Sequence, residues 1–512
     1  MSEAPLMLGV SGLRGIVGRS LTPEVAARFA GVVGSWVVES GRGGGGGRGG
    51  GVGGKAGGKR PLVVVGFDGR LGGAALFSVV TASLQAAGCD VLAMGTVMTP
   101  SVGVIVDLAG AAAGVVVTAS HNPQEWNGIK VIAREAGVRR GAVSASAPSK
   151  ALADEIIARF RGTPPAWCGP EGLGVLRPRL SLAYRHEEQV VGLIRERGDL
   201  ARLRRRKFRV ALDTVAGSGA VWGGRFLEAV GCRVHELYPV LKFGSGKFPH
   251  APEPTRENLG ALRRATKKFK ADVGFAQDPD ADRLAIVDER GEYIGEEYTL
   301  VLAAEALLSE SATQRGSGKG RKDRVLVANL STSRMIDDVA ARHGARVVRT
   351  AVGEANVVEV MKREAAAGKD VVVGGEGNGG VIWPRVTYVR DSLSAMGLVL
   401  SLMARRGQRL SEIVASMPSY AIEKRKVELA RKEEAKPAVE KIAAFYGKRG
   451  SALHGGVKID RQDGVRVDFV QERAWLHVRA SNTEPIMRLI AEAPTAAGAR
   501  GVLEEAEKVI GG

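Results

Sequence analysis

At 512 residues the chain is too long for one hydrophobic core, and we expect three or four domains. Its 73 Lys and Arg residues against 55 Asp and Glu residues give a net charge of +18, which suits an enzyme of anionic substrates and also permits binding to a polyanion. Three cysteines without metal-ligand spacing argue against a disulfide scaffold, and the N-terminus lacks a basic, apolar leader, so we expect a cytoplasmic protein.

The first predicted elements lie around a glycine-punctuated loop, GVSGLRG at residues 9–15, which carries Arg14. Thr22 and Pro23 then supply an N-cap and a first helical position, and apolar residues at helical spacing follow, so we expect a helix there. Residues 41–58 are almost pure glycine with scattered cations. Such a composition cannot bury a core and predicts a flexible insertion.

The stretch GVVVTASHNPQEWNGIK at residues 114–130 carries the clearest chemical signal. Its three consecutive valines predict a short buried strand at 115–117. The strand ends in a polar loop with Ser120 and His121, and Lys130 follows after one turn. Ligands of open α/β sheets bind beyond the carboxyl ends of the strands, so we expect a reactive site here. The plainer alternatives are a capping serine and a structural histidine.

A second α/β unit is predicted from strands at 208–212 and 272–276. The latter strand ends in QDPDADR, which places Asp278, Asp280 and Asp282 close together. Two like charges about 4 Å apart repel by roughly 4 kcal/mol at an effective dielectric constant near 20, so the three carboxylates need a cation or partial protonation. Oxygen ligands favour Mg²⁺, Mn²⁺ or Ca²⁺ over zinc. A solvated acidic turn is the alternative interpretation.

A third α/β unit and a smaller C-terminal domain contribute further polar loops. In the third unit, which a Ser/Gly/Lys-rich linker at 309–323 interrupts, a strand at 371–373 runs into GGEGNGG. Glu376 and Asn378 of that loop suit sugar hydroxyls. The C-terminal domain carries RASNTEP at 479–485, whose groups suit a phosphate dianion, with an N-capped helix start as the alternative. Three similar layers, each with one such loop, suggest a shared cleft.

Four of these motifs, in this order, resemble the α-D-phosphohexomutase family: TASHNP with NGIK, DPDADR, GEGNGG and RASNTEP. GVSGLRG and TAVGEANV support the resemblance, which covers about residues 9–495. It implies an α/β fold of four domains, in which three related α/β domains with mixed sheets and a smaller α+β C-terminal domain surround a central cleft. The expected domains are 1–175, 176–292, 293–410 and 411–512.

The resemblance also implies roles for individual residues. Ser120 would carry the transferred phosphoryl group as phosphoserine, and one Mg²⁺ per chain would be held by that phosphate with Asp278, Asp280 and Asp282. Arg14, Lys130 and His121 would assist the transfer. The residues implied to bind the substrate are Gly353, Arg283, Glu376, Asn378, Arg479, Ser481, Asn482, Thr483 and Arg488.

The implied activity is that of a phosphohexomutase, an isomerase that moves a phosphoryl group between the 1- and 6-positions of a hexose phosphate. A sugar bisphosphate would be both intermediate and activator. Pro279 stands where the family commonly has glycine, and GEGNGG looks like the archaeal-type sugar loop. We therefore expect glucosamine phosphate as substrate, before glucose or mannose phosphate. A metal-dependent phosphatase and a polyanion-binding protein are the alternatives from other classes. We expect a monomer or homodimer with neither nucleic acid nor a membrane as partner.

Overall fold

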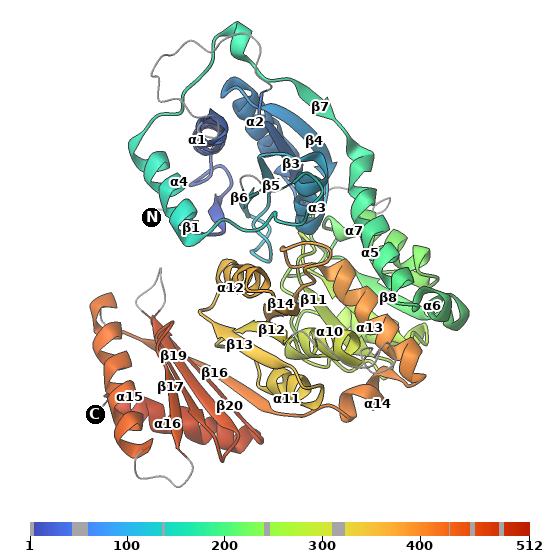
Figure 1. Cartoon of the computed structure of the whole chain (residues 1–512), viewed down its shortest axis with the longest axis vertical. Coiled ribbons are helices and arrows are strands. Elements are labelled where there is room, and N and C mark those ends of the chain that lie inside the picture. The colour runs from blue at the N-terminus through green and yellow to red at the C-terminus, as the bar shows by residue number, and fades with distance from the viewer. Residues whose placement is uncertain are drawn as a thin grey trace. The chain divides into compact units, whose positions relative to one another are not determined.

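In the part of the chain that it describes, the computed structural model contains four β-sheets (Figure 1). The structure describes residues 5–42, 60–135, 139–239, 246–309, 323–429, 431–450, 456–480 and 486–511. The chain separates into unit 1, which comprises Met1–Leu307 and Gly379–Val414, and unit 2, which comprises Leu308–Asn378 and Ala415–Gly512. Almost all of the predicted glycine tract at 41–58 and of the linker at 309–323 lies outside the described residues.

The largest sheet of unit 1 is mixed. Its strands, in spatial order, are β1 (Met7–Gly9), β2 (Gly12–Ile16), β6 (Trp126–Ala133), β5 (Ala113–Val117), β3 (Leu62–Phe67), β4 (Asp90–Thr96) and β7 (Leu176–Pro178). The first four pair antiparallel, and the last four, from β5 onward, pair parallel. The predicted strand at 115–117 is confirmed, and Lys130 lies on β6 beside β5.

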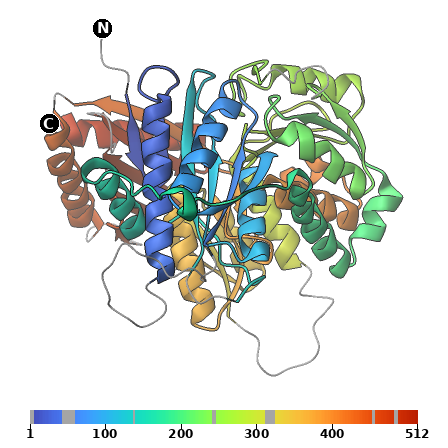
Figure 2. The same ribbon diagram turned by 90° about the horizontal axis from the view of Figure 1, so that it is seen from above.

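One face of this sheet packs against α1 (Pro23–Arg42), α2 (Gly73–Ala86) and α4 (Lys150–Gly162) in a single buried cluster. Figure 2 shows α1 as the long dark blue helix, and its contact with α2 is extensive. The predicted start of α1 is confirmed, because the amide of Val25 donates to Thr22 Oγ1 at 3.4 Å. The valines of β3 and β5 that point into this cluster are Val63, Val65, Val115 and Val117.

Helix α3 (Thr99–Ala109) packs on β3 and β5 and brings its first residues to the edge of the sheet where Ser120 lies. Glycine permits this close packing. A Cβ atom at Gly114 would come within 2.7 Å of Val102 Cγ1 and 2.9 Å of Val106 Cγ2. Gly114 therefore allows the helix to approach the sheet.

The predicted loop at 9–15 is wrong, because the structure has a β-hairpin there. β1 and β2 pair antiparallel with Gly9 opposite Gly12, and β2 also pairs with β6. Leu13 is fully buried, and Gly12 has a φ of 90°. A Cβ atom at Gly12 would lie 2.0 Å from the carbonyl oxygen of Ile129. Gly12 thus allows a close approach between strands, and Arg14 projects from a strand.

The second sheet of unit 1 has the order β11 (Leu284–Asp288), β10 (Val273–Gln277), β8 (Arg209–Asp213) and β9 (Arg233–Glu236). β11 is antiparallel to β10, and the other pairs are parallel. The other helices and strands of unit 1 are α5 (Tyr184–Glu196), α6 (Leu200–Arg206), α7 (Gly219–Ala229), α9 (Gly260–Lys268), α10 (Glu297–Leu308), β15 (Gly380–Ile382), α13 (Ser392–Arg406) and α14 (Leu410–Ala415), with the 3₁₀ helices η1 (Pro170–Gly172) and η2 (Leu180–Ala183). Residues 392–403 of α13 are all buried, as expected of a central helix.

Unit 2 contains a parallel sheet and an antiparallel sheet. In the first, β12 (Arg324–Asn329) lies between β13 (Arg346–Thr350) and β14 (Asp370–Glu376), with helices α11 (Met335–Arg342) and α12 (Glu354–Ala366). The second has the order β16 (Ala421–Glu428), β20 (Ile486–Ala493), β19 (Ala474–Ala480), β18 (Val465–Phe469) and β17 (Val457–Asp460). Helices α15 (Ala435–Gly450) and α16 (Ala496–Gly511), with η4 (Lys432–Glu434) before them, cover one face of the second sheet (Figure 1). In the described part of the chain no helix combines the length and the apolar character that a membrane span requires.

Candidate active site

Ser120 lies in the loop after β5 in a left-handed backbone conformation, with φ of 50°. Such a conformation costs roughly 1–2 kcal/mol for a residue other than glycine, so neighbouring groups must stabilise it. The buried guanidinium of Arg70 donates to the carbonyl oxygens of Ser120 and Trp126 (2.7 Å for the latter) and to the carboxylate of Asp68 (2.8 Å). The amide of Ser120 donates to Thr118 Oγ1 at 2.8 Å, and that hydroxyl donates to Asp68 at 2.6 Å.

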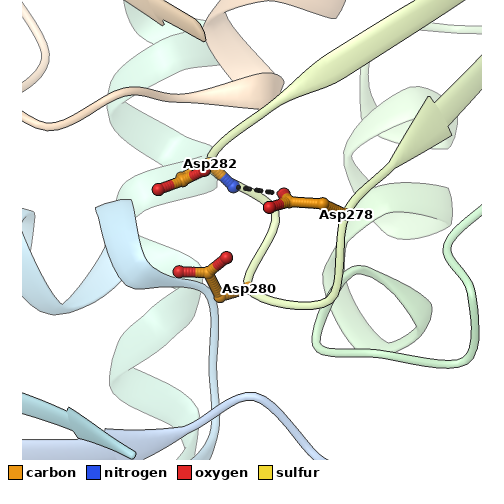
Figure 3. Close-up of side chains that lie close together, drawn as sticks. All are labelled: Asp278, Asp280 and Asp282. Atoms are coloured by element: carbon orange, nitrogen blue, oxygen red, sulfur yellow. Dashed lines mark hydrogen bonds between the residues drawn. The ribbon is translucent and has the colours of Figure 1, made fainter. Parts of the chain in front are cut away.

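Three aspartates, Asp278, Asp280 and Asp282, follow β10 and are fully buried. Figure 3 shows their carboxylates around a common space, and one ligand atom from each lies within 4.8 Å of the others. The loop begins with a tight turn in which the amide of Ala281 donates to the carbonyl of Asp278 at 2.9 Å. Pro279 takes the second position of this turn, where its fixed φ is favoured, so proline is compatible with the loop.

Ser120 meets this loop although 158 positions separate it from Asp278. The hydroxyl of Ser120 donates to Asp278 Oδ2 at 2.9 Å. The ammonium of Lys130 donates to Asp280 Oδ2 at 2.9 Å and to Asp282 Oδ2 at 3.0 Å. The structure therefore brings the serine, the lysine and the three carboxylates into one buried cluster.

The charges of this cluster are unequally balanced. Burial, with Asp282 and Asp280 next to it, raises the pKa of Asp278 well above its usual range. Burial would also raise the pKa of Asp282, but Arg390 and Lys130 outweigh it and hold that pKa below its ordinary value. The pKa of Asp280 is likewise lowered, because Lys130 and a hydrogen bond from Thr99 outweigh burial and the charge of Asp282.

The donor set fits a divalent cation. The ligands on offer are all carboxylate oxygens, which Mg²⁺, Mn²⁺ and Ca²⁺ prefer. Asp280 Oδ1 and Asp282 Oδ1 are buried and have no hydrogen-bond partner among the described residues. Buried carboxylate oxygens without partners are costly, and a cation would satisfy them. This cluster can therefore hold a metal ion.

The other predicted catalytic residues surround Ser120. His121 Nδ1 lies 3.4 Å from Ser120 Oγ. Burial, with Arg283 and Arg14 nearby, lowers the pKa of His121 to about 3, so its ring is neutral at neutral pH. Arg14 donates to Asn122 Oδ1 of the serine loop at 2.9 Å, and the backbone amide of Arg283 donates to Asp278 Oδ1 at 3.1 Å.

Three residues that support this site were missed in the sequence. Thr99, the first residue of α3, donates to Asp280 Oδ2 at 2.6 Å. Arg390, next to the N-cap of α13, donates to Asp282 Oδ2 at 2.7 Å. Arg70 is the third of these residues. It alone had a local signal, the polar FDGR at 67–70 shortly after the valines at 63–65, since Thr99 and Arg390 lie more than 100 positions from the aspartates that they bond.

In unit 2 the predicted sugar-binding residues Glu376, Asn378 and Gly353 lie together. Glu376 Oε1 accepts hydrogen bonds from the amide of Gly353 at 3.1 Å and from Asn329 Nδ2 at 2.8 Å. Asn378 Nδ2 lies 3.5 Å from Glu376 Oε2. Gly353 has a φ of 122°, which only glycine adopts readily, and this backbone aims its amide at the carboxylate. Asn329, at the end of β12, was missed by sequence reasoning.

The predicted phosphate-binding arginines are cross-strand partners on the face of the C-terminal sheet opposite its helices. Arg479 on β19 pairs with Arg488 on β20, and Arg488 pairs in turn with Lys426 on β16. Directly opposed side chains point to the same face, so three cations form a row across three strands. Like charges in that arrangement repel each other, which favours the binding of an anion. Lys426 was missed in the sequence, and the predicted Ser481, Asn482 and Thr483 lie outside the described residues.

Comparison with known proteins agrees with this architecture. The profiles of the four phosphoglucomutase/phosphomannomutase domains match: α/β/α domain I at 5–145, α/β/α domain II at 191–291, α/β/α domain III at 296–420 and the C-terminal domain at 425–509. A phosphoglucomutase/phosphomannomutase from Thermococcus kodakarensis is 32% identical over 98% of both chains. A probable phosphoglucosamine mutase from Methanopyrus kandleri is 33% identical over 97% of this chain and 96% of its own.

Among solved structures, a phosphoglucomutase/phosphomannomutase family protein from Burkholderia thailandensis superposes with a TM-score of 0.75 and 25% identity, over 98% of both chains. The four domain matches follow one another along the chain from residue 5 to residue 509. The chain belongs to the phosphoglucomutase/phosphomannomutase family, and it is a phosphohexomutase, an isomerase.

Proposed function

We propose that this phosphohexomutase transfers a phosphoryl group between Ser120 and the two ends of a hexose phosphate, with Mg²⁺ bound by Asp278, Asp280 and Asp282. The observation that carries the proposal is the 2.9 Å hydrogen bond between Ser120 Oγ and Asp278 Oδ2. This bond supports the proposal, because the oxygen that would bear the phosphate lies next to one of the carboxylates that would bind the cation. When bound, the cation would neutralise charge on the transferring phosphoryl group.

The residues of the chain would act by position and charge. The bond between Ser120 Oγ and phosphorus breaks while a bond from a sugar hydroxyl to phosphorus forms, which yields a sugar bisphosphate. The hydroxyl proton passes to the ring of His121, which is neutral, while Lys130, as an ammonium group, would donate toward the transferring phosphoryl group. The other phosphoryl group then returns to Ser120 as the reaction reverses at the opposite end of the sugar. Arg14 and Arg283 would offset charge around the serine.

Sugar and phosphate recognition is assigned to unit 2. Glu376, Asn378 and the amide of Gly353 would hold sugar hydroxyls, because a carboxylate and an amide offer both acceptors and donors there. Arg479 and Arg488, with Ser481, Asn482 and Thr483, would hold the phosphate that is not transferred. We also propose that the chain divides into domains near residues 175, 292 and 410, which the separate family matches support.

Glucosamine phosphate is the proposed substrate, with glucose or mannose phosphate as the alternative. The names of the relatives support both, since one is a probable phosphoglucosamine mutase and another a phosphoglucomutase/phosphomannomutase. The test is a coupled assay with glucosamine 6-phosphate, glucose 1-phosphate and mannose 1-phosphate, each with and without a trace of the sugar bisphosphate. We expect the highest kcat/KM with glucosamine 6-phosphate and no turnover by Ser120→Ala.

Mass spectrometry of the purified protein supplies the control. If Ser120 carries phosphate and none of the three sugars turns over, the proposal is wrong. If Ser120→Ala retains activity on the best substrate, the serine is not the phosphoryl carrier.

A further inference from the structure

Three buried residues, Ser101, His186 and Asp391, form a row of hydrogen bonds close in sequence to the residues that bond the carboxylate cluster. Ser101 Oγ lies 3.0 Å from His186 Nδ1, and His186 Nε2 lies 3.0 Å from Asp391 Oδ2. These residue types also occur in hydrolase triads. Here all three side chains are fully buried, so no substrate can reach the serine hydroxyl. The role of the row must therefore come from the residues next to Ser101 and Asp391 rather than from chemistry at the serine.

At one end of the row, Ser101 belongs to α3, whose first residue, Thr99, forms two hydrogen bonds to Asp280. The hydroxyl of Thr99 donates to Asp280 Oδ2 at 2.6 Å, and the amide of Thr99 donates to the carbonyl of Asp280 at 3.0 Å. Thr99 and Ser101 are two residues apart in the first turn of one helix. A shift of Ser101 therefore shifts the group that holds Asp280.

At the other end, Asp391 lies at the start of α13, and its two neighbours in the chain form hydrogen bonds to the metal loop. Arg390 donates to Asp282 Oδ2 at 2.7 Å, and Ser392 Oγ donates to the carbonyl of Ala281 at 2.6 Å. Asp391 itself caps α13, since its carboxylate accepts from the amide of Leu393 at 2.9 Å. Residues 390–392 thus form one rigid attachment point.

His186 is joined by hydrogen bonds to both attachment points, although it lies on α5. A carboxylate only accepts hydrogen bonds, so Nε2 of His186 donates to Asp391, and in the neutral ring Nδ1 accepts from Ser101. We propose that His186 is a positioning residue that fixes the separation of Asp280 and Asp282 and thereby sets the affinity of the cluster for a divalent cation. This inference rests on the metal site of the proposed function. Partners that bond metal ligands directly typically change metal affinity or activity by about 10–100-fold when removed, and because His186 acts one residue further back we expect the lower end of that range.

The test measures Mn²⁺ binding to the purified full-length chain by isothermal titration calorimetry. Ser101→Ala removes one bond of the row with little change in volume, and we expect about tenfold weaker binding. His186→Gln keeps a donor for Asp391 but offers no ring acceptor to Ser101, so it should weaken binding to a similar extent. In both variants the Mg²⁺ concentration for half-maximal mutase activity should rise, while kcat at saturating Mg²⁺ changes less.

Ser144→Ala is the matched control. Ser144 is also buried, and its hydroxyl donates to Asp107 Oδ1 of the same helix α3 at 3.1 Å, at the end far from Asp280. It should lose stability without losing Mn²⁺ affinity. If Ser101→Ala and His186→Gln both bind Mn²⁺ as the wild type does, the inference is wrong.

The wild-type chain separates this inference from the proposed function. Wild-type protein that binds Mn²⁺ but turns over no sugar phosphate contradicts the proposed function and leaves the role of His186 to be decided by the variants. Wild-type protein that binds no Mn²⁺ contradicts the metal site and this inference together.

Discussion

The serine–carboxylate cluster of unit 1 and the cationic row of unit 2 (Lys426, Arg488 and Arg479) differ in how far their charges are buried and paired. In unit 1 three fully buried carboxylates are each held by hydrogen bonds from distant parts of the chain. In unit 2 Lys426 and Arg488 are exposed and oppose each other across two strands. Groups held rigidly before substrate arrives favour the transition state, whereas exposed cations mainly attract and hold an anion. We therefore expect changes in the cluster to lower kcat and changes in the row to raise KM.

The largest effect is expected from Asp282→Asn. This change removes a potential metal ligand and leaves Lys130 and Arg390 with a neutral partner in a buried place. We expect kcat/KM to fall by about 1000-fold, because charge stabilisation in a preorganised site is the largest catalytic term. Asp288→Asn is the control, since Asp288 is also buried and pairs with Arg290 at 2.7 Å, away from the cluster. Steady-state kinetics should show near-normal kcat for Asp288→Asn. Equal losses of kcat in both variants would contradict a special role for the carboxylate cluster.

A smaller loss of activity is expected from Arg70→Lys. Lysine keeps the charge but donates from a single nitrogen, which cannot reach the positions of Asp68 and of the two carbonyl oxygens that three different guanidinium nitrogens reach. The left-handed conformation of Ser120 would then be less populated, and we expect kcat to fall by about 100-fold with stability lower by about 3 kcal/mol. Arg466→Lys is the comparison, because Arg466 is equally buried in unit 2. Urea unfolding should show a loss in both, whereas a comparable fall of kcat in Arg466→Lys would contradict a special role for Arg70.

The smallest effect is expected from Lys426→Ala. Loss of one charge-assisted contact to a phosphate should raise KM by about tenfold with kcat nearly unchanged. The salt dependence of KM should become weaker, because an exposed charge is screened by ions. Lys424→Ala is the matched control, since Lys424 is exposed on the same strand but opposes Ile490. If kcat rather than KM changes in Lys426→Ala, the cationic row does more than bind the substrate, and the expected difference between the row and the carboxylate cluster is wrong.

Much of this site is local in sequence and was predictable. The serine loop and the metal loop each follow a short apolar strand, and their polar residues stand out against ordinary turn chemistry. The packing that brings them together is not local. Thr99, Arg390 and His186 look like helix-start or helix-surface residues until the fold places them against partners more than 80 positions away. The hairpin at 7–16 was mistaken for a loop because glycine signals both irregular backbone and close strand contact.

Lys130 spans two of the carboxylates that a cation would bind. The protein therefore carries a counter-ion of its own, and after treatment with a chelator we expect Asp280 and Asp282 to stay paired with Lys130 and the chain to stay folded. Lys130 occupies the Oδ2 atoms of Asp280 and Asp282, whereas their Oδ1 atoms have no partner among the described residues. A divalent ion would therefore share these two carboxylates with an ammonium group, and a rise in the charge of either one would weaken the hold of the other.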